Sequence, residues 1–219
     1  MTIEAGLMLK YPTDNMIQNA YKGKFIVLEG IDGSGKSTLA RELRDFLIKK
    51  DFDVVLTREP QDRDLGKRQD IMPRERQILM IEDRKKHLVE VIIPALKTGK
   101  IVICDRYSLS AFAYGKSEGI KLSEIREWHR MKIGKKFIWP DLTILLDAPT
   151  EIAYQRLGKK DEKGYFEKIE MLEKIRRNYF ILSLTKEFPN VFIVYADRPQ
   201  EDVFEAALNI VKKQLKLKI

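Results

Sequence analysis

The stretch GIDGSGKSTL, residues 30–39, follows the apolar run at residues 25–28 and opens a helical pattern. Its first eight residues match G-x-x-x-x-G-K-[ST] in full, with a strand expected before it and a helix after it. Glycines let backbone N–H groups turn inward around phosphate oxygens, and the positive end of the helix dipole faces the same point. The stretch therefore predicts a nucleoside triphosphate site between a strand and the helix that follows it.

Two side chains of this stretch carry the expected phosphate chemistry. Lys36 should reach the β- and γ-phosphates, and the Ser37 hydroxyl should hold Mg²⁺. A glycine-rich turn that binds nothing is the alternative, although the pattern and its context agree. The stretch does not say whether the terminal phosphate is released to water, works as a switch or passes to another molecule.

The composition is that of a globular chain that binds anions. Its 219 residues, 44% hydrophobic and 34% charged, suit one domain. The net charge of +8 favours nucleotides, nucleic acid or acidic surfaces without choosing among them. The single cysteine, Cys104, fits a reducing compartment. No apolar run approaches the ~20 residues of a membrane span, and we see no secretory signal, so we expect a cytoplasmic protein with no membrane partner.

Strand and helix patterns alternate along residues 23–219, which we interpret as a single domain. Apolar runs suited to buried parallel strands lie at residues 25–29, 53–57, 100–104, 142–147 and 191–195. Helical spacing is found at residues 36–49, 74–97, 121–133, 149–157, 165–187 and 199–215. This order predicts the α/β class, with a doubly wound five-stranded parallel sheet flanked by helices. Residues 1–22 lack lasting periodicity and are expected to be an N-terminal extension, helical in part or disordered.

Charged residues follow the strands, where the ligands of such sheets bind. Arg58 ends the second strand and Arg106 follows the third. An arginine buried at a strand tip is costly unless an anion meets it, so two of them suggest a second phosphate site. A phosphotransferase needs such an acceptor site, whereas a hydrolytic switch does not. In the alternative, the two arginines simply pair with their neighbours Glu59 and Asp105.

Four stretches, GIDGSGKST, TREP, DRYSLSAFAYG and PDLTILLD, together resemble the thymidylate kinase family. The likeness runs from about Lys24 to the C-terminal helix. It implies a P-loop nucleoside monophosphate kinase fold, a homodimer, and phosphate transfer from ATP to dTMP with Mg²⁺. The alternatives are a kinase of another deoxynucleotide and a P-loop switch or binding protein. Only net charge supports a nucleic-acid partner, because aromatic residues are not interleaved with basic ones.

The resemblance also implies a set of site residues. Those expected to be catalytic are Lys36, Asp105, Arg106 and Arg156. Those expected to bind ATP are Gly30, Ile31, Asp32, Gly33, Ser34, Gly35, Lys36, Ser37, Thr38, Lys159 and Lys160. Those expected to bind the acceptor are Asp32, Arg58, Met80, Arg84, Arg106, Tyr107, Ser110 and Tyr114. Ser37 and Asp105 are expected to hold the metal.

Individual roles follow from the matched motifs. Arg58 corresponds to the arginine that holds the acceptor phosphate, and Arg106 to the one that bridges donor and acceptor. Asp32 corresponds to a carboxylate that faces the acceptor, and Tyr114 to an aromatic whose bulk can exclude a ribose 2′-OH. Arg84 corresponds to the arginine that hydrogen-bonds the pyrimidine. Without the resemblance, Arg84 would be interpreted as a solvated charge on a helix.

A basic segment at residues 156–164 is expected to be a lid that closes over the triphosphate and excludes water. In some family members an extra catalytic arginine follows the aspartate of the phosphate loop, but here that position is Gly33. The positive charge must then come from the lid. Arg156 is the one arginine of that segment, and lysines lack its bidentate fork.

The residues expected around the acceptor base depart from the family pattern. Met80 stands where a phenylalanine usually stacks on thymine, and Ala111 where some members have an asparagine. Gly115 takes a position that is commonly glutamine in bacterial members. Phosphoryl transfer is therefore expected, while a looser deoxypyrimidine preference stays open. His87 and His129 have no partner spacing for a metal or a triad, so surface positions on helices are expected for both.

Overall fold

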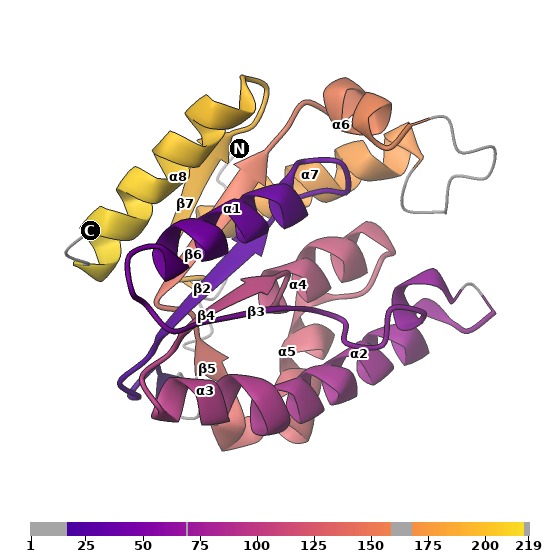
Figure 1. Cartoon of the computed structure of the whole chain (residues 1–219). Coiled ribbons are helices and arrows are strands. Elements are labelled where there is room, and N and C mark those ends of the chain that lie inside the picture. The colour runs from indigo at the N-terminus through magenta and orange to yellow at the C-terminus, as the bar shows by residue number, and fades with distance from the viewer. Residues whose placement is uncertain (1–16, 69, 159–167, 217–219) are drawn as a thin grey trace, which may run out of the picture.

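The computed structural model describes residues 17–68, 70–158 and 168–216, and its centre is a parallel β-sheet (Figure 1). The five strands are β2 (Lys24–Glu29), β3 (Val54–Arg58), β4 (Ile101–Asp105), β6 (Leu142–Asp147) and β7 (Val191–Tyr195). Their order in space is β3-β4-β2-β6-β7, and every neighbouring pair is parallel. The predicted α/β class and doubly wound five-stranded sheet are confirmed.

Helices cover both faces of this sheet. α1 (Lys36–Ile48) and α8 (Gln200–Leu215) lie together on one face (Figure 1). The helices on the other side are α2 (Pro73–His87), α3 (Ile93–Lys97), α4 (Ser108–Ser117), α5 (Leu122–Lys132) and α7 (Ile169–Ser183). A short helix, α6 (Thr150–Arg156), follows β6.

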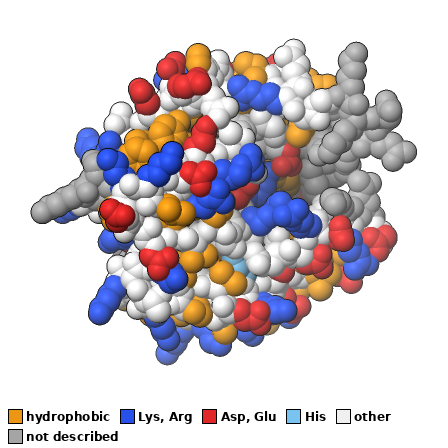
Figure 2. Space-filling view, viewed as in Figure 1, with side chains coloured by type: hydrophobic (Ala, Val, Ile, Leu, Met, Phe, Trp, Pro, Cys, Tyr) orange, Lys and Arg blue, Asp and Glu red, His pale blue; other side chains and the backbone are white. Residues whose placement is uncertain are grey.

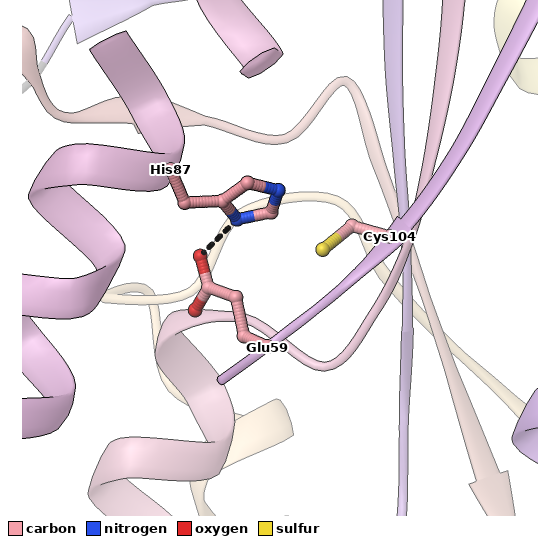
Figure 3. Close-up of side chains that lie close together, drawn as sticks. All are labelled: Glu59, His87 and Cys104. Carbon is pink, nitrogen blue, oxygen red and sulfur yellow. Dashed lines mark hydrogen bonds and ion pairs between the residues drawn. The ribbon is translucent and has the colours of Figure 1, made fainter. Parts of the chain in front are cut away.

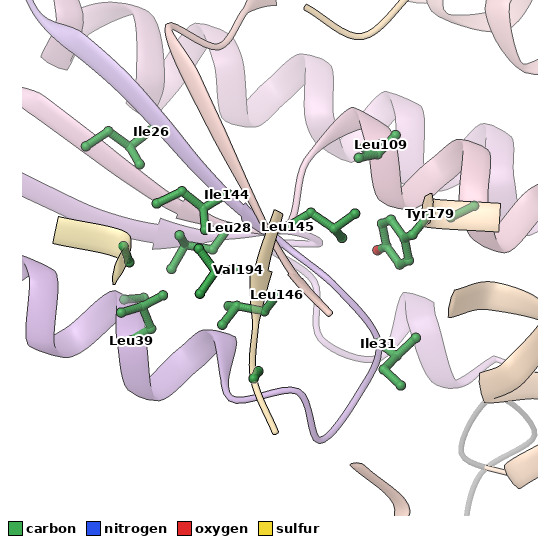
Figure 4. Close-up of a cluster of buried hydrophobic side chains, with 14 of the residues drawn as sticks. Ile26, Leu28, Ile31, Leu39, Leu109, Ile144, Leu145, Leu146, Tyr179 and Val194 are labelled. Atoms are coloured by element: carbon green, nitrogen blue, oxygen red, sulfur yellow. The ribbon is translucent and has the colours of Figure 1, made fainter. Parts of the chain in front are cut away.

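The core explains why the run at residues 25–28 is apolar throughout. Successive side chains of a strand point to opposite faces, so Ile26 and Leu28 pack with Leu39 of α1 in one buried cluster (Figure 4). Phe25 and Val27 pack in a second buried cluster on the opposite face. Both faces of β2 are therefore buried, and the glycine loop begins at the end of a strand that is packed on both sides.

Two helical segments differ from the prediction. The sequence assigns no helix to residues 108–117, yet α4 occupies them; this helix is buried on most sides, so it lacks a polar stripe to reveal its period. The helix expected at residues 74–97 is interrupted by a π-helical turn, η3 (Leu88–Ile92), between α2 and α3. Pro94 lies just beyond this turn, and a proline ring clashes with the regular α-helical turn before it.

The last residues of the expected N-terminal extension are tied to the domain. β1 (Ile17–Gln18) pairs in parallel with β5 (Ile138–Trp139) as a separate two-stranded sheet. The Asn19 amide donates to the Asp141 carboxylate at 2.6 Å, and that carboxylate also accepts from the backbone N–H of Phe25 at 2.7 Å. Helix or disorder was expected here, and a short strand is found instead. Residues 1–16 lie outside the described residues.

The strand register brings the predicted site to one edge of the sheet. Leu28 of β2 lies beside Asp105 of β4, which lies beside Arg58 of β3. The glycine loop, Asp105 and Arg58 therefore meet at the carboxyl ends of three adjacent strands. Within the described ranges, no helix is both long and apolar enough to cross a membrane. On the face seen in Figure 2, basic and acidic side chains are interspersed.

Candidate active site

The phosphate loop connects β2 to α1 and already surrounds its lysine. Gly35, at φ 98°, takes the left-handed backbone conformation that glycine adopts most easily. The buried Lys36 Nζ donates to the Ile31 carbonyl oxygen at 2.7 Å and to Ser34 Oγ at 3.4 Å. Burial, followed by the charge of Arg106, lowers the pKa of Lys36 to about 8. The ammonium group thus lies inside the loop, bonded to groups that a phosphate oxygen can replace.

Ser37 and Asp105 form the pair of oxygen donors expected for a metal. Ser37 Oγ donates to Asp105 Oδ2 at 2.5 Å, and Asp105 is only 8% exposed. The other carboxylate oxygen, Oδ1, is buried and has no hydrogen-bond partner among the described residues. Hydroxyl and carboxylate oxygens are the ligands that Mg²⁺ takes beside phosphates. This donor set fits a magnesium ion. Such an ion would give Asp105 Oδ1 the partner that it lacks in the described part of the chain.

Arg106 is the centre of the polar cluster beside the phosphate loop. It donates from Nη2 to Asp32 Oδ1 at 2.6 Å, and from Nη1 to the Gly30 carbonyl oxygen at 3.1 Å. Nη1 also lies 3.3 Å from Ser110 Oγ and 3.1 Å from the Tyr179 hydroxyl. Its backbone has φ 75°, which is strained for a residue with a side chain. The local strain is tolerated because four partners hold the guanidinium in place.

Asp32 and Tyr114 complete this cluster. The Tyr114 hydroxyl donates to Asp32 Oδ2 at 3.0 Å, and Arg106 lies over the Tyr114 ring at 5.1 Å. Desolvation raises the pKa of Asp32, but the positive charges of Arg106 and Lys36 outweigh it and lower the pKa to about 2. Asp32 is therefore an anion at neutral pH, next to the site where phosphate would bind.

The two ion pairs considered as an alternative for the strand-tip arginines do not form. Arg106 pairs with Asp32 rather than with Asp105. Glu59 pairs with Arg84 and His87 rather than with Arg58. Arg58 itself is exposed at the tip of β3. Both arginines lie at strand tips, but only Arg106 is held within the polar cluster.

Two residues under the cluster were missed by the sequence analysis. Glu29, the last residue of β2, is fully buried and accepts hydrogen bonds from the backbone N–H groups of Tyr107 and Ser110. It also accepts from Ser110 Oγ at 2.6 Å and from the Tyr179 hydroxyl at 3.1 Å. An acid that ends an apolar strand is a visible signal for Glu29, whereas nothing in the helical pattern of α7 singles out Tyr179.

The Arg84 side chain is buried and is not exposed to solvent. It is 3% exposed, and it donates from Nε to Glu59 at 2.6 Å and from Nη2 to the Tyr107 carbonyl oxygen at 3.0 Å. Its Nη1 lies 2.7 Å from His129 Nε2. His87 and His129 are 1% and 0% exposed, so the surface positions expected for both histidines are wrong. His129 packs against the rings of Phe112 and Phe137, and His87 is hydrogen-bonded to Thr57 and Glu59, about 30 residues earlier in the chain.

Glu59, His87 and Cys104 also offer three metal-ligand types close together (Figure 3). The geometry favours a hydrogen-bonded network instead. Glu59 is already bound by the Arg84 guanidinium, and His87 lies between Glu59 Oε1 at 3.1 Å and Thr57 Oγ1 at 2.8 Å. Burial raises the pKa of Cys104 well above its ordinary value, so its thiol stays protonated. Cys104 is therefore an inert buried thiol.

The remaining predicted acceptor residues lie in different surroundings. Tyr107 is fully buried in the second core cluster, and its hydroxyl donates to the Ile138 carbonyl oxygen at 3.2 Å. Its ring supports Arg84, whose guanidinium lies 5.1 Å from the ring centre. Tyr107 is therefore a core residue in this structure, and its expected contact with the acceptor stays a prediction. Met80 is partly exposed on α2, close to Gly66.

The lid residues are only partly described. Arg156 ends α6, is exposed, and donates from Nη1 to the Ala196 carbonyl oxygen at 2.9 Å. Lys159 and Lys160 lie outside the described residues. Gly33, where an arginine stands in some family members, has φ 81° and packs against α6. A Cβ atom at this position would be 2.1 Å from the Ala153 carbonyl oxygen, so no side chain fits there.

A doubly wound parallel sheet with a phosphate loop between β2 and α1 defines the class of this protein, a P-loop kinase fold. A family model described as thymidylate kinase matches residues 28–207. The chain belongs to the thymidylate kinase family. It is thus an enzyme of the nucleoside monophosphate kinase type.

Individual relatives agree with this assignment. A probable thymidylate kinase of Thermococcus onnurineus (strain NA1) is 39% identical over 208 residues, which cover 87% of this chain and 98% of the relative. A probable thymidylate kinase of Methanosarcina mazei is 41% identical over 203 residues, covering 89% and 96%. The crystal structure of thymidylate kinase from Ehrlichia chaffeensis superposes with a TM-score of 0.69 at 25% identity, covering 86% of this chain and 98% of that one.

Proposed function

We propose that this enzyme transfers the γ-phosphate of ATP to dTMP, forming ADP and dTDP. The observation that carries the proposal is the Asp32–Arg106–Tyr114 cluster beside the phosphate loop. A hydrolytic switch has no use for a second charged cradle next to its triphosphate site, whereas a phosphotransferase must hold two nucleotides in line.

Each side chain has a role that its position supports. Lys36 leaves its loop carbonyl to neutralise the β- and γ-phosphates of ATP. Arg106 bridges the donor and acceptor phosphates, and Arg58, at the adjacent strand tip, holds the acceptor phosphate from the solvent side. Because charge in the transition state spreads over the transferred phosphoryl oxygens, fixed guanidinium groups stabilise it more than the ground state.

Ser37 and Asp105 would hold Mg²⁺, which supplies charge neutralisation on the phosphates when it is bound. Asp32 faces the acceptor as an anion and can accept a hydrogen bond from a sugar hydroxyl. Tyr114, bonded to Asp32, occupies space beside that sugar and so favours a deoxyribose. Arg84 donates to the pyrimidine base from beneath, and Met80 packs against the ring.

The lid, the assembly and the cell compartment are also proposals. We propose that residues 156–164 close over ATP, with Arg156, Lys159 and Lys160 supplying charge, and that the enzyme is a cytoplasmic homodimer built from one domain per chain. The family resemblance supports the dimer. The buried, unpaired Cys104 is consistent with a reducing compartment.

An acceptor panel tests the central proposal. ADP formation is measured with ATP and Mg²⁺ in the presence of dTMP, dUMP, dCMP or dGMP, and with no acceptor. We expect ADP formation to depend on the acceptor and to be fastest with dTMP. ADP release that needs no monophosphate would contradict a kinase, and equal turnover of all four would contradict a thymidylate kinase.

A further inference from the structure

A buried network links the tip of β3 to α5 beneath the proposed acceptor site. Glu59 accepts from Arg84 Nε at 2.6 Å and lies 3.1 Å from His87 Nδ1. Arg84 Nη1 meets His129 Nε2 at 2.7 Å, and Arg84 Nη2 donates to the Tyr107 carbonyl oxygen at 3.0 Å. Glu59, Arg84, His87 and His129 are each no more than 3% exposed.

The partners of His129 fix which of its ring nitrogens carries the proton. Nδ1 lies 2.8 Å from the Ile125 carbonyl oxygen, which can only accept, so Nδ1 is protonated. The arginine at Nε2 can only donate, so Nε2 presents a lone pair. The ring centroids of Phe112 and Phe137 lie 5.4 and 5.8 Å from the centroid of the imidazole. His129 is therefore an uncharged hydrogen-bond acceptor held at one orientation.

We infer that His129 is a positioning residue for the acceptor base, acting through Arg84. The inference rests on the proposed function. A guanidinium has five N–H groups, and three of those on Arg84 are used by Glu59, His129 and the Tyr107 carbonyl. One N–H on Nη1 and one on Nη2 remain. His129 sets the plane of the guanidinium, and with it the direction of the two N–H groups that remain.

The two remaining N–H groups of Arg84 are hydrogen-bond donors, and this determines which bases they can bind. Arginine offers donors only, so a base that presents a carbonyl oxygen, as thymine and uracil do, can pair with it. A base that presents an amino group at that edge, such as cytosine, meets donor against donor. A buried donor left without a partner is unfavourable, so a fixed guanidinium rejects the amino base. A rotating guanidinium would lose that discrimination.

Paired substitutions at His129 test the inference. His129→Phe keeps an aromatic volume but removes the acceptor, whereas His129→Gln keeps an amide oxygen for Arg84. We expect H129F to raise the KM for dTMP at least tenfold and to lower the dTMP-over-dCMP ratio of kcat/KM at least fivefold. The KM for ATP should change less than twofold. H129Q should stay within threefold of the wild type in all three values.

A control variant separates positioning from general loosening of the core. Phe137→Leu weakens packing on the same imidazole without touching a hydrogen bond to Arg84. F137L should lower the melting temperature but leave the KM for dTMP and the base preference unchanged. If a folded H129F keeps the KM and the preference of the wild type, or if F137L reproduces its effects, Arg84 is structural and the inference is wrong.

A spectroscopic readout on the wild-type protein tests the same inference. The chain has two histidines, so the long-range ¹H–¹⁵N spectrum of the wild-type imidazoles is simple to assign with a His87→Asn variant. We expect His129 to be protonated at Nδ1 and not at Nε2 at pH 7. The opposite tautomer would overturn the inference. A wild type that shows no dTMP-dependent ADP formation would instead overturn the proposed function.

Discussion

Lys36 shows how one residue links burial to a measurable pH dependence. Desolvation in the phosphate loop, with the nearby charge of Arg106, lowers its pKa from 10.5 to about 8. The protonated form binds phosphate, so kcat/KM for ATP, which reports groups of the enzyme form that binds ATP, should be level below pH 8 and fall about tenfold per pH unit above it.

Lys36→Arg is the matched control for that profile. Its guanidinium stays protonated throughout the accessible pH range, so this variant, although slower, should lose the decline above pH 8. The measurement is kcat/KM for ATP at saturating acceptor between pH 6 and 10. A decline that persists in the arginine variant would assign the titration to another group.

The close approach of Ala153 explains why residue 33 is a glycine. A Cβ atom would come within 2.1 Å of the Ala153 carbonyl oxygen, in addition to the strain of a positive φ. Gly33→Ala should therefore displace the loop from α6 and raise the KM for ATP at least tenfold. Gly99→Ala separates the two causes, because Gly99 has φ 86° but open space around it.

G99A should lower stability by the backbone strain alone and leave ATP binding unchanged. The two variants are compared by melting temperature and by KM for ATP. If G33A binds ATP as G99A does, the contact with α6 does not shape the phosphate loop, and the absence of an arginine at residue 33 needs another explanation.

At the scale of elements, Arg156 tests the lid. In the structure its guanidinium is bonded to the Ala196 carbonyl oxygen, so serving the triphosphate requires that this bond be exchanged for phosphate when the lid closes. Arg156→Ala should lower kcat at least tenfold, because lysines beside it are point charges without a bidentate fork. Arg130→Ala, which removes an exposed arginine paired with Glu127 on α5, is the control. Unchanged kcat in R156A would refute the lid role.

The elements also show what the sequence can and cannot predict. The strands and the phosphate loop follow from local patterns, since buried runs and glycine spacing are readable in short windows. α4 was not predicted because a helix buried on most sides has no polar period. β1 was missed because two residues gain their structure only by pairing with β5, about 120 positions away.

The same limit applies within the site. Asp105 and Arg106 stand at the end of β4, and Lys36 begins the helix that follows the neighbouring strand β2, so topology alone brings them together. The network around Arg84 depends on contacts across 25 and 45 residues, to Glu59 and to His129. A lone histidine on a helix carries no sequence signal that it will face a buried arginine. Its role becomes visible only when the helices are packed.

On the scale of the whole molecule, burying a neutral histidine makes stability depend on pH. Burial, and then the charge of Arg84, lowers the pKa of His129 from 6.5 to about 3. Between these values the unfolded chain binds a proton that the folded chain does not. Stability from this group is therefore complete above pH 6.5 and is lost as the pH falls toward 3. From pH 7 to pH 5 the loss amounts to about 2 kcal/mol.

His129→Gln removes this titration while keeping an acceptor for Arg84. Urea unfolding of the wild type and of H129Q at pH 7 and pH 5 gives the free energy of unfolding at each pH. The drop between the two pH values should be smaller in H129Q by about 2 kcal/mol. An equal drop in both proteins would mean that His129 accepts a proton while the chain is folded. Arg84 would then face a cation instead of a lone pair, and the network could not hold its guanidinium in the orientation described.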